Sequence, residues 1–156
     1  YFFFLESQNL NVITSVSSLL NSQISKERNI NMLSSYRSET YENENISFQH
    51  LGNLKFTYPT YFYPKYDEEL NELNDLFFEN FGKLPNKIVI RAYEITLDLI
   101  LRSAFRRKLV KSINIGETKY YQKRFKYKKL NDAYINESVL LIQHNDLDVF
   151  EITSEK

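Results

Sequence analysis

The sequence of 156 residues contains no cysteine and no tryptophan, only three glycines and three prolines, and its formal net charge is zero. Without cysteine, disulfide bonds, thiolate metal sites and cysteine nucleophiles are excluded, whereas either redox compartment stays open. Three glycines provide no glycine-rich loop to cradle a phosphate. The balanced charge creates no overall field that would attract nucleic acid or an anionic membrane. No apolar run approaches the ~20 residues that span a bilayer.

Apolar and aromatic residues, in contrast, are abundant, at 42% and 15% of the chain. This content argues against disorder, and the length fits one domain with a single good core. Strand-like and helix-like patterns alternate through the first two thirds, and the last third carries period-two patterns. The predicted class is therefore α/β, with a largely parallel sheet followed by an antiparallel tail.

The first apolar segment, Tyr1–Leu5, is predicted to be a strand buried on both faces, because five apolar residues follow one another. A protein seldom begins inside its own central strand, so we expect further residues upstream in a longer parent protein. Period and capping residues predict the elements that follow: a helix over 10–24, a strand over 30–33, a polar loop over 34–45, a brief helix over 46–51 and a strand over 54–58.

Two predicted helices of different character come next. Asp67–Phe81 has an apolar stripe opposite an acidic face, which is typical of a surface helix. Gly82 is suited to a helix C-cap, and Pro85 cannot continue the helix. Asn86 can cap the second helix. That helix, Lys87 to about Lys108, is apolar on most of its circumference, so we expect it to be covered on several sides.

The last third of the chain predicts strands. Aromatic residues alternate with basic and amide residues over 121–128, and the strands 139–142 and 147–152 flank a turn at His144-Asn145-Asp146. Basic and aromatic residues are interleaved over 102–129, a composition that could bind nucleic acid, anionic glycans or lipid head groups. An edge strand with core-facing aromatics and water-facing lysines explains the same pattern and is the favoured interpretation, so no nucleic-acid partner is predicted.

No catalytic residue, metal ligand or cofactor is predicted. His50 and His144 are far apart in turn-like settings and are interpreted as lone surface histidines. No glycine pattern of a nucleophile elbow supports a serine triad. The acidic residues between Glu68 and Asp75 fall on the wet face of a helix. The chain is therefore expected not to be an enzyme.

Five short motifs and the order of elements resemble one known family. The motifs are Leu5-Glu6-Ser7-Gln8, Asn31-Met32-Leu33-Ser34, Phe56-Thr57-Tyr58-Pro59, Phe81-Gly82-Lys83-Leu84-Pro85 and Tyr93-Glu94-Ile95-Thr96. Together they resemble the second lobe of type-1 periplasmic binding proteins, the branched-chain amino-acid-binding-like or receptor ligand-binding family. The tail over 125–152 is similar to divergent envelope-associated members from Bacteroidetes-like bacteria.

The resemblance implies a three-layer α/β/α lobe with a mainly parallel sheet. Residues 1–110 would form the second lobe, residues 111–156 would form its closing strands and hinge-crossing tail, and the upstream lobe would be absent. Such proteins close two lobes around a small ligand in the periplasm or cell envelope, for uptake through an ABC transporter or for sensing. The expected function is therefore non-enzymatic capture of a small solute.

In open α/β sheets, ligands bind beyond the carboxyl ends of the strands. The predicted ligand-binding residues there are Ser7 and Gln8, which could donate or accept hydrogen bonds beside a helix N-terminus, Tyr36 as a stacking face, and Arg37 as a bidentate carboxylate clamp. Neighbouring residues at the same edge complete the predicted cleft: Glu6, Ser34, Ser35 and Tyr58.

One departure from the family pattern leaves two functions open. Members that bind amino acids usually place a carboxylate after the second strand to hold the ligand ammonium, and here that stretch is Ser34–Arg37. The ligand would be an amino acid, a peptide or a cell-wall fragment, and a membrane transporter or envelope protein would be the partner. The alternative is a degenerate binding fold that acts as a protein–protein or cell-wall-associated scaffold without a small ligand. In either case the isolated chain is expected to expose an apolar seam and to self-associate.

Overall fold

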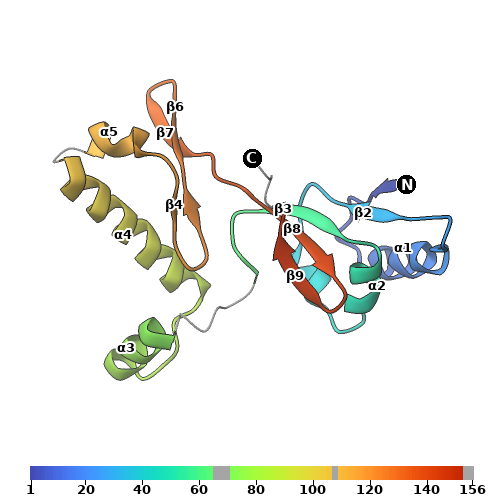
Figure 1. The fold of residues 1–156 in the computed structure, drawn as a ribbon. Coiled ribbons are helices and arrows are strands. Elements are labelled where there is room, and N and C mark those ends of the chain that lie inside the picture. Colours follow the sequence, from blue (N-terminus) through green and yellow to red (C-terminus); the bar gives the residue numbers. More distant parts are fainter. Residues whose placement is uncertain (65–70, 107–108, 153–156) are drawn as a thin grey trace. The chain divides into compact units, whose positions relative to one another are not determined.

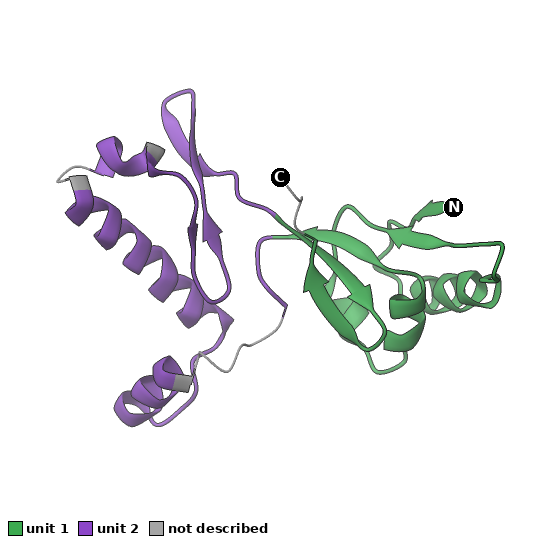
Figure 2. Cartoon of the chain, viewed as in Figure 1, with its two compact units in different colours: residues 1–60, 140–156 green, residues 61–139 purple. Residues whose placement is uncertain are grey.

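The computed structural model describes residues 1–64, 71–106 and 109–152 of the chain (Figure 1). The chain forms two compact units (Figure 2): unit 1 comprises residues 1–60 and 140–156, and unit 2 comprises residues 61–139. The boundary predicted at residue 110 falls inside unit 2. The assignment of either part to a lobe of a two-lobed protein stays a prediction. Each unit is described below by itself.

Unit 1 is built on a five-stranded sheet with the order β1-β2-β3-β8-β9. The first three strands, β1 (Phe2–Phe4), β2 (Asn31–Leu33) and β3 (Thr57–Thr60), are parallel to one another. The last two, β8 (Leu140–Asn145) and β9 (Asp148–Glu151), are antiparallel to their neighbours. The α/β class and the antiparallel tail are confirmed, but the sheet is mixed rather than mainly parallel.

The helices of unit 1 are α1 (Leu10–Ser22), the short 3-10 helix η1 (Glu39–Glu42) and α2 (Phe48–Asn53). The Asn9 side chain caps α1 by accepting hydrogen bonds from the backbone N–H groups of Asn11 and Val12, at 2.9 and 3.3 Å. The Ser47 hydroxyl caps α2 in the same way. The core consists mainly of aliphatic and aromatic side chains: Ile13, Leu20, Ile30, Met32, Tyr41, Ile46, Leu51, Leu54, Phe56, Tyr58, Leu140 and Ile142.

The prediction that the first strand is buried on both faces is wrong. Among the described strands, β1 pairs only with β2 and lies at the edge of the sheet. As a result, Phe2 and Phe4 are 72% and 71% exposed. The prediction of a turn at His144 is also wrong, because β8 continues through this residue and its side chain is buried. The turn lies between Asn145 and Asp148, with Asp146 in the left-handed region at φ 53°.

Unit 2 contains the helices α3 (Asn71–Phe81), α4 (Lys87–Arg106) and α5 (Leu109–Ser112), followed by the 3-10 helix η3 (Ile113–Ile115). Two separate hairpins follow: β4 (Thr118–Lys119) with β5 (Arg124–Phe125), and β6 (Tyr127–Leu130) with β7 (Ala133–Asn136). The single strand predicted over 121–128 is therefore divided between two hairpins. Lys123, which has the same parity as the aromatic residues of this stretch, is buried.

The ends of the two long helices agree with the sequence patterns. Gly82 follows α3 with φ 66°, and its N–H donates to the carbonyl of Phe78 at 2.8 Å. The Asn86 side chain caps α4 by accepting from the backbone N–H groups of Ile88 and Val89, both at 3.0 Å. The predicted start of the first helix at Asp67 lies outside the described residues. Its expected buried stripe is only partly buried, since Phe81 is exposed.

The prediction that α4 is covered on several sides is wrong. Several of its apolar side chains are each more than half exposed, namely Ile88, Ile100, Leu101 and Phe105. The buried side chains recur at four-residue steps instead: Ile90, Glu94, Asp98 and Arg102. Three of these four carry ionisable groups, so the buried face of α4 is largely polar. Within the described ranges no helix is long and apolar enough to cross a membrane.

Candidate functional site

The loops that follow β1 and β2 meet at the carboxyl edge of the parallel strands. The Glu6 carboxylate accepts a hydrogen bond from the backbone N–H of Ser35 at 2.5 Å. The Thr40 hydroxyl donates to the carbonyl of Gln8 at 3.1 Å. Two segments that are about thirty residues apart in sequence are thereby joined at the position where open α/β sheets bind ligands.

The four residues predicted to bind ligand have different roles in this arrangement. The Ser7 hydroxyl accepts from the N–H of Asn9 at 3.1 Å and so supports the start of α1. Gln8 contributes its backbone carbonyl to Thr40. The Tyr36 ring is partly exposed, and its backbone is held by the hydroxyl of Ser34. Arg37, the fourth, lies against the buried Tyr58 ring.

Arg37 lies between an acidic and an aromatic side chain. Its Nη1 is 3.0 Å from the Glu42 carboxylate, and its Cζ lies 5.5 Å from the centre of the Tyr58 ring. Its Nε is buried and has no hydrogen-bond partner among the described residues. Tyr58 was predicted to lie at this edge, and the contact with Arg37 places it there.

Further buried polar atoms near Arg37 also lack partners within the described ranges. They are the Ser38 hydroxyl, the Tyr41 hydroxyl and both ring nitrogens of His144. Buried polar groups are usually hydrogen-bonded, and an unpaired one costs about 1–3 kcal/mol. Several in one region indicate a place where a ligand or ordered water supplies the missing partners.

Aromatic rings connect these groups. Tyr41 stacks on Phe56 with ring centres 4.7 Å apart, and the His144 ring lies 5.6 Å from Phe56 and 6.0 Å from Tyr58. Phe48 of α2 completes this set at 5.6 Å from His144. We call Arg37, Ser38, Tyr41, Tyr58 and His144 the Arg37 cluster.

The charge state of the Arg37 cluster follows from burial. Burial raises the pKa of Tyr41 to about 12, an effect that Glu6 and Tyr36 reinforce and the Arg37 charge opposes. Burial likewise raises the pKa of Tyr58. Burial, and then the charge of Arg37, lowers the pKa of His144 to about 4. Both phenols keep their protons and the imidazole is neutral at pH 7, so Arg37 is the cation of the cluster.

Sequence reasoning missed two members of this cluster. Tyr41 was placed in a polar loop, and His144 was placed in a surface turn. Tyr41 was missed because the residues around it show no helical spacing of apolar side chains. His144 was missed because the order of the strands, which the sequence does not show, decides which face of β8 is covered. An aromatic residue within a polar stretch was the one local signal that could have singled out Tyr41.

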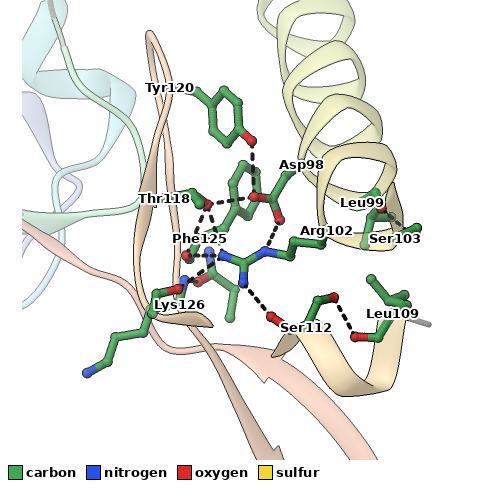
Figure 3. Close-up of polar contacts among 12 residues, drawn as sticks. Asp98, Leu99, Arg102, Ser103, Leu109, Ser112, Thr118, Tyr120, Phe125 and Lys126 are labelled. Carbon is green, nitrogen blue, oxygen red and sulfur yellow. Dashed lines mark hydrogen bonds and ion pairs between the residues drawn. The ribbon is translucent and has the colours of Figure 1, made fainter. Parts of the chain in front are cut away.

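A second polar cluster, in unit 2, is fully paired (Figure 3). The Arg102 Nε donates to Asp98 Oδ2 at 2.8 Å, and its terminal nitrogens donate to the carbonyls of Ser112, Gly116 and Phe125. Asp98 Oδ1 accepts from the hydroxyls of Thr118 and Tyr120, at 2.6 and 3.1 Å. Every part of this buried pair is engaged by its own chain, so we assign it a structural role.

Neither cluster resembles a metal centre. Among the residues that the structure describes, no group of three or more histidine, aspartate or glutamate side chains could hold a metal ion. No family model matches the chain, and no curated protein or solved structure is significantly similar to it. The family resemblance therefore stays a prediction, and the Arg37 cluster is the principal candidate site.

Proposed function

We propose that this chain belongs to a non-enzymatic, solute-binding-type protein of the cell envelope, which captures a small ligand at the carboxyl edge of β1, β2 and β3. The observation that carries the proposal is the Arg37 cluster, where a cation adjoins several buried polar atoms that lack partners within the described residues. The three-layer lobe, the periplasmic location and the role in uptake or sensing are parts of this proposal that rest on the resemblance.

The geometry of Arg37 favours a ligand with a carboxylate. Its Nη1 is engaged by Glu42, whereas its buried Nε has no hydrogen-bond partner among the described residues. In a guanidinium the Nε–H and one N–H of Nη2 are parallel donors, the arrangement that matches both oxygens of one carboxylate. Because Nε is buried, a carboxylate bound there is withdrawn from water, and the charge-assisted hydrogen bonds are strengthened.

The surroundings favour a second, less polar part of the ligand. Tyr41, Tyr58 and Phe56 provide aromatic surface, and the neutral His144 adds a ring with one donor and one acceptor. Small-molecule sites typically combine apolar walls with a few placed polar groups. A carboxylate attached to an apolar or aromatic body fits this description, which includes amino-acid derivatives, short peptides and cell-wall fragments.

The proposal is tested by thermal unfolding of the chain with a panel of amino acids, short peptides, nucleosides and cell-wall fragments. A ligand that binds only the folded state raises the melting temperature as its concentration rises. We expect a carboxylate-containing compound to do so and Arg37→Gln to abolish its effect. The matched control is Arg28→Gln, because Arg28 lies on the surface of the same unit. An effect that survives Arg37→Gln would contradict the proposed site.

One observation favours the alternative function, a protein–protein or cell-wall-associated scaffold without a small ligand. Apolar side chains are exposed on β1 in unit 1 and on α4 in unit 2. Contiguous exposed apolar surface is typical of interaction sites. The same surfaces support the proposal that the isolated chain self-associates. A panel without any hit, together with a mass that increases with concentration in analytical ultracentrifugation, would favour the scaffold.

A further inference from the structure

A group of charged side chains in unit 2 surrounds the Phe62 ring. The Lys123 Nζ lies 4.3 Å from the ring centre, and the Arg91 Cζ lies 5.8 Å from it. Lys123 occupies the turn between β4 and β5, whereas Arg91 lies in the first half of α4. An aromatic face attracts cations, which explains why two of them share one ring.

Lys123 is unusual because most of its long side chain is buried. The residue is 7% exposed, although lysine is almost never buried without a paired charge. Among the described residues, no carboxylate lies within 4.0 Å of its Nζ. Burial and then the charge of Arg91 lower the pKa of Lys123, and Glu94 acts in the opposite direction. Lys123 therefore has no ion-pair partner among the described residues, although a second cation, Arg91, faces the same ring.

The carboxylate of Glu94, which lies near Lys123, binds the backbone instead of the lysine. Glu94 is fully buried, and its Oε1 accepts a hydrogen bond from the backbone N–H of Gln122 at 2.7 Å. This contact fastens the turn between β4 and β5 to α4. The second oxygen, Oε2, is buried and has no hydrogen-bond partner among the described residues. Glu94 thus orders the turn that carries Lys123 without forming an ion pair with it.

We propose that Arg91 and Lys123, with Phe62 as an apolar wall, bind a small anion that carries carboxylate or phosphate oxygens. A buried charge is stable when an opposite charge and hydrogen bonds accompany it, and such an anion supplies both. Lys123 offers three donors at a point charge, and Arg91 offers a planar fork. Arg91 is exposed and Lys123 is mostly buried, so the guanidinium is the more accessible of the two cations.

This site is independent of the Arg37 cluster, because its residues belong to unit 2. A ligand of the Arg37 cluster is expected to bind whether or not Lys123 is present. The two proposals are therefore tested separately, and a negative result for one site does not contradict the other.

The test is a titration of the chain with sodium phosphate and, separately, with sodium acetate, at constant ionic strength adjusted with sodium chloride. Constant ionic strength removes general screening of surface charges. The side-chain ammonium of Lys123 and the Nε–H of Arg91 are followed by NMR. We expect a saturable shift of both signals with at least one anion. A shift with phosphate alone indicates that the site binds a phosphate group, and a shift with acetate alone indicates that it binds a carboxylate. Shifts with both indicate that the site binds any small anion of this charge and size.

Three variants make the test specific. Lys123→Met keeps the apolar stem and removes the charge, and Arg91→Gln removes the charge of an exposed residue. We expect each to weaken anion binding about tenfold or more, as loss of a charge-assisted hydrogen bond does. Lys119→Met is the control, because Lys119 is an exposed lysine of the same hairpin. Equal binding by all three variants and the parent chain, or no saturable shift with either anion, would overturn the proposal.

Discussion

The two units differ in the charged side chains that they bury. In unit 1, aliphatic and aromatic residues fill the core, and the one imidazole within it, His144, is neutral at pH 7. In unit 2, α4 buries Glu94, Asp98 and Arg102 and leaves apolar residues such as Phe105 exposed. The difference shows that the spacing of apolar residues in the sequence identifies the buried residues only where the core is apolar. The same spacing does not identify the buried residues where a helix packs through hydrogen bonds to buried charged groups.

Arg102 in unit 2 and Arg37 in unit 1 differ in how many of their donors are used. Arg102 donates to Asp98, to Thr118 and to three backbone carbonyls, so its capacity is used within the chain. Arg37 holds Glu42 through one nitrogen, and its buried Nε has no partner among the described residues. A saturated guanidinium stabilises a fold, whereas one with an open donor can accept a ligand. This contrast is why we place binding in unit 1 and a structural role at Arg102.

The largest expected effect is the loss of the charge pair in unit 2. Arg102→Met leaves Asp98 buried without its cation, which typically costs about 3–5 kcal/mol. We expect the free energy of unfolding of unit 2 to fall by that amount, measured as loss of hydrogen-exchange protection along α4. Unit 1 amides, for example along α1, are expected to keep their protection.

The control for Arg102→Met is Lys126→Met. The Lys126 Nζ is 3.1 Å from a Glu137 oxygen, and the lysine side chain is 55% exposed. Surface ion pairs contribute about 0–1 kcal/mol, so this variant is expected to be nearly neutral. Equal costs for the two substitutions would contradict a structural role for the buried pair.

An effect of intermediate size is expected from pH in unit 1. The pKa of His144 is about 4 in the folded chain, whereas an exposed histidine of the unfolded chain has the ordinary pKa of 6.5. As pH falls from 6.5 to 4, the unfolded chain takes up this proton first, so the stability of unit 1 declines through this window. The loss reaches about 3 kcal/mol below pH 4. Urea unfolding at several pH values measures it.

Two histidine variants test the origin of that pH dependence. His144→Phe removes the titrating group from an aromatic environment, and we expect the decline between pH 6.5 and 4 to become much smaller. His50→Gln removes the other histidine and is expected to leave the decline in place. A decline that persists unchanged in His144→Phe would show that another group is responsible.

The smallest effects are expected from the helix caps, which are matched between the units. Asn9 caps α1 and Asn86 caps α4, each by accepting two backbone hydrogen bonds. Substitution of either by alanine is expected to cost about 1 kcal/mol. Hydrogen exchange should place the loss of Asn9→Ala in unit 1 and that of Asn86→Ala in unit 2. Equal losses in both units from either variant would show that the units unfold together.

Local signals in the sequence predicted local structure well. The end of α3 at Gly82, the cap at Asn86 and the antiparallel tail follow from residues that act on their own neighbours. The carboxyl edge of β1 and β2 was also predicted, because the ends of parallel strands meet at one edge. Arg37 follows β2 there and contacts Tyr58, and its role in binding a ligand stays a prediction.

Properties that depend on distant partners could not be predicted in this way. The edge position of β1 follows from strand order, which its own residues do not encode. The burial of His144 depends on rings contributed by α2 and β3. The burial of Arg102 on α4 depends on carbonyls and a hydroxyl that follow it by 10 to 23 residues. The resemblance to type-1 periplasmic binding proteins stays a prediction.

The most direct test of ligand binding at Arg37 compares the Nε–H signals of Arg37 and Arg102 by NMR, while the chain is titrated with the carboxylate compound that stabilises it most in the thermal panel. A ligand bound through the open Nε of Arg37 must perturb that signal, whereas Arg102 is already saturated by its own chain. We predict a saturable shift at Arg37 and none at Arg102. An unchanged Arg37 signal at ligand concentrations that stabilise the chain would contradict this prediction.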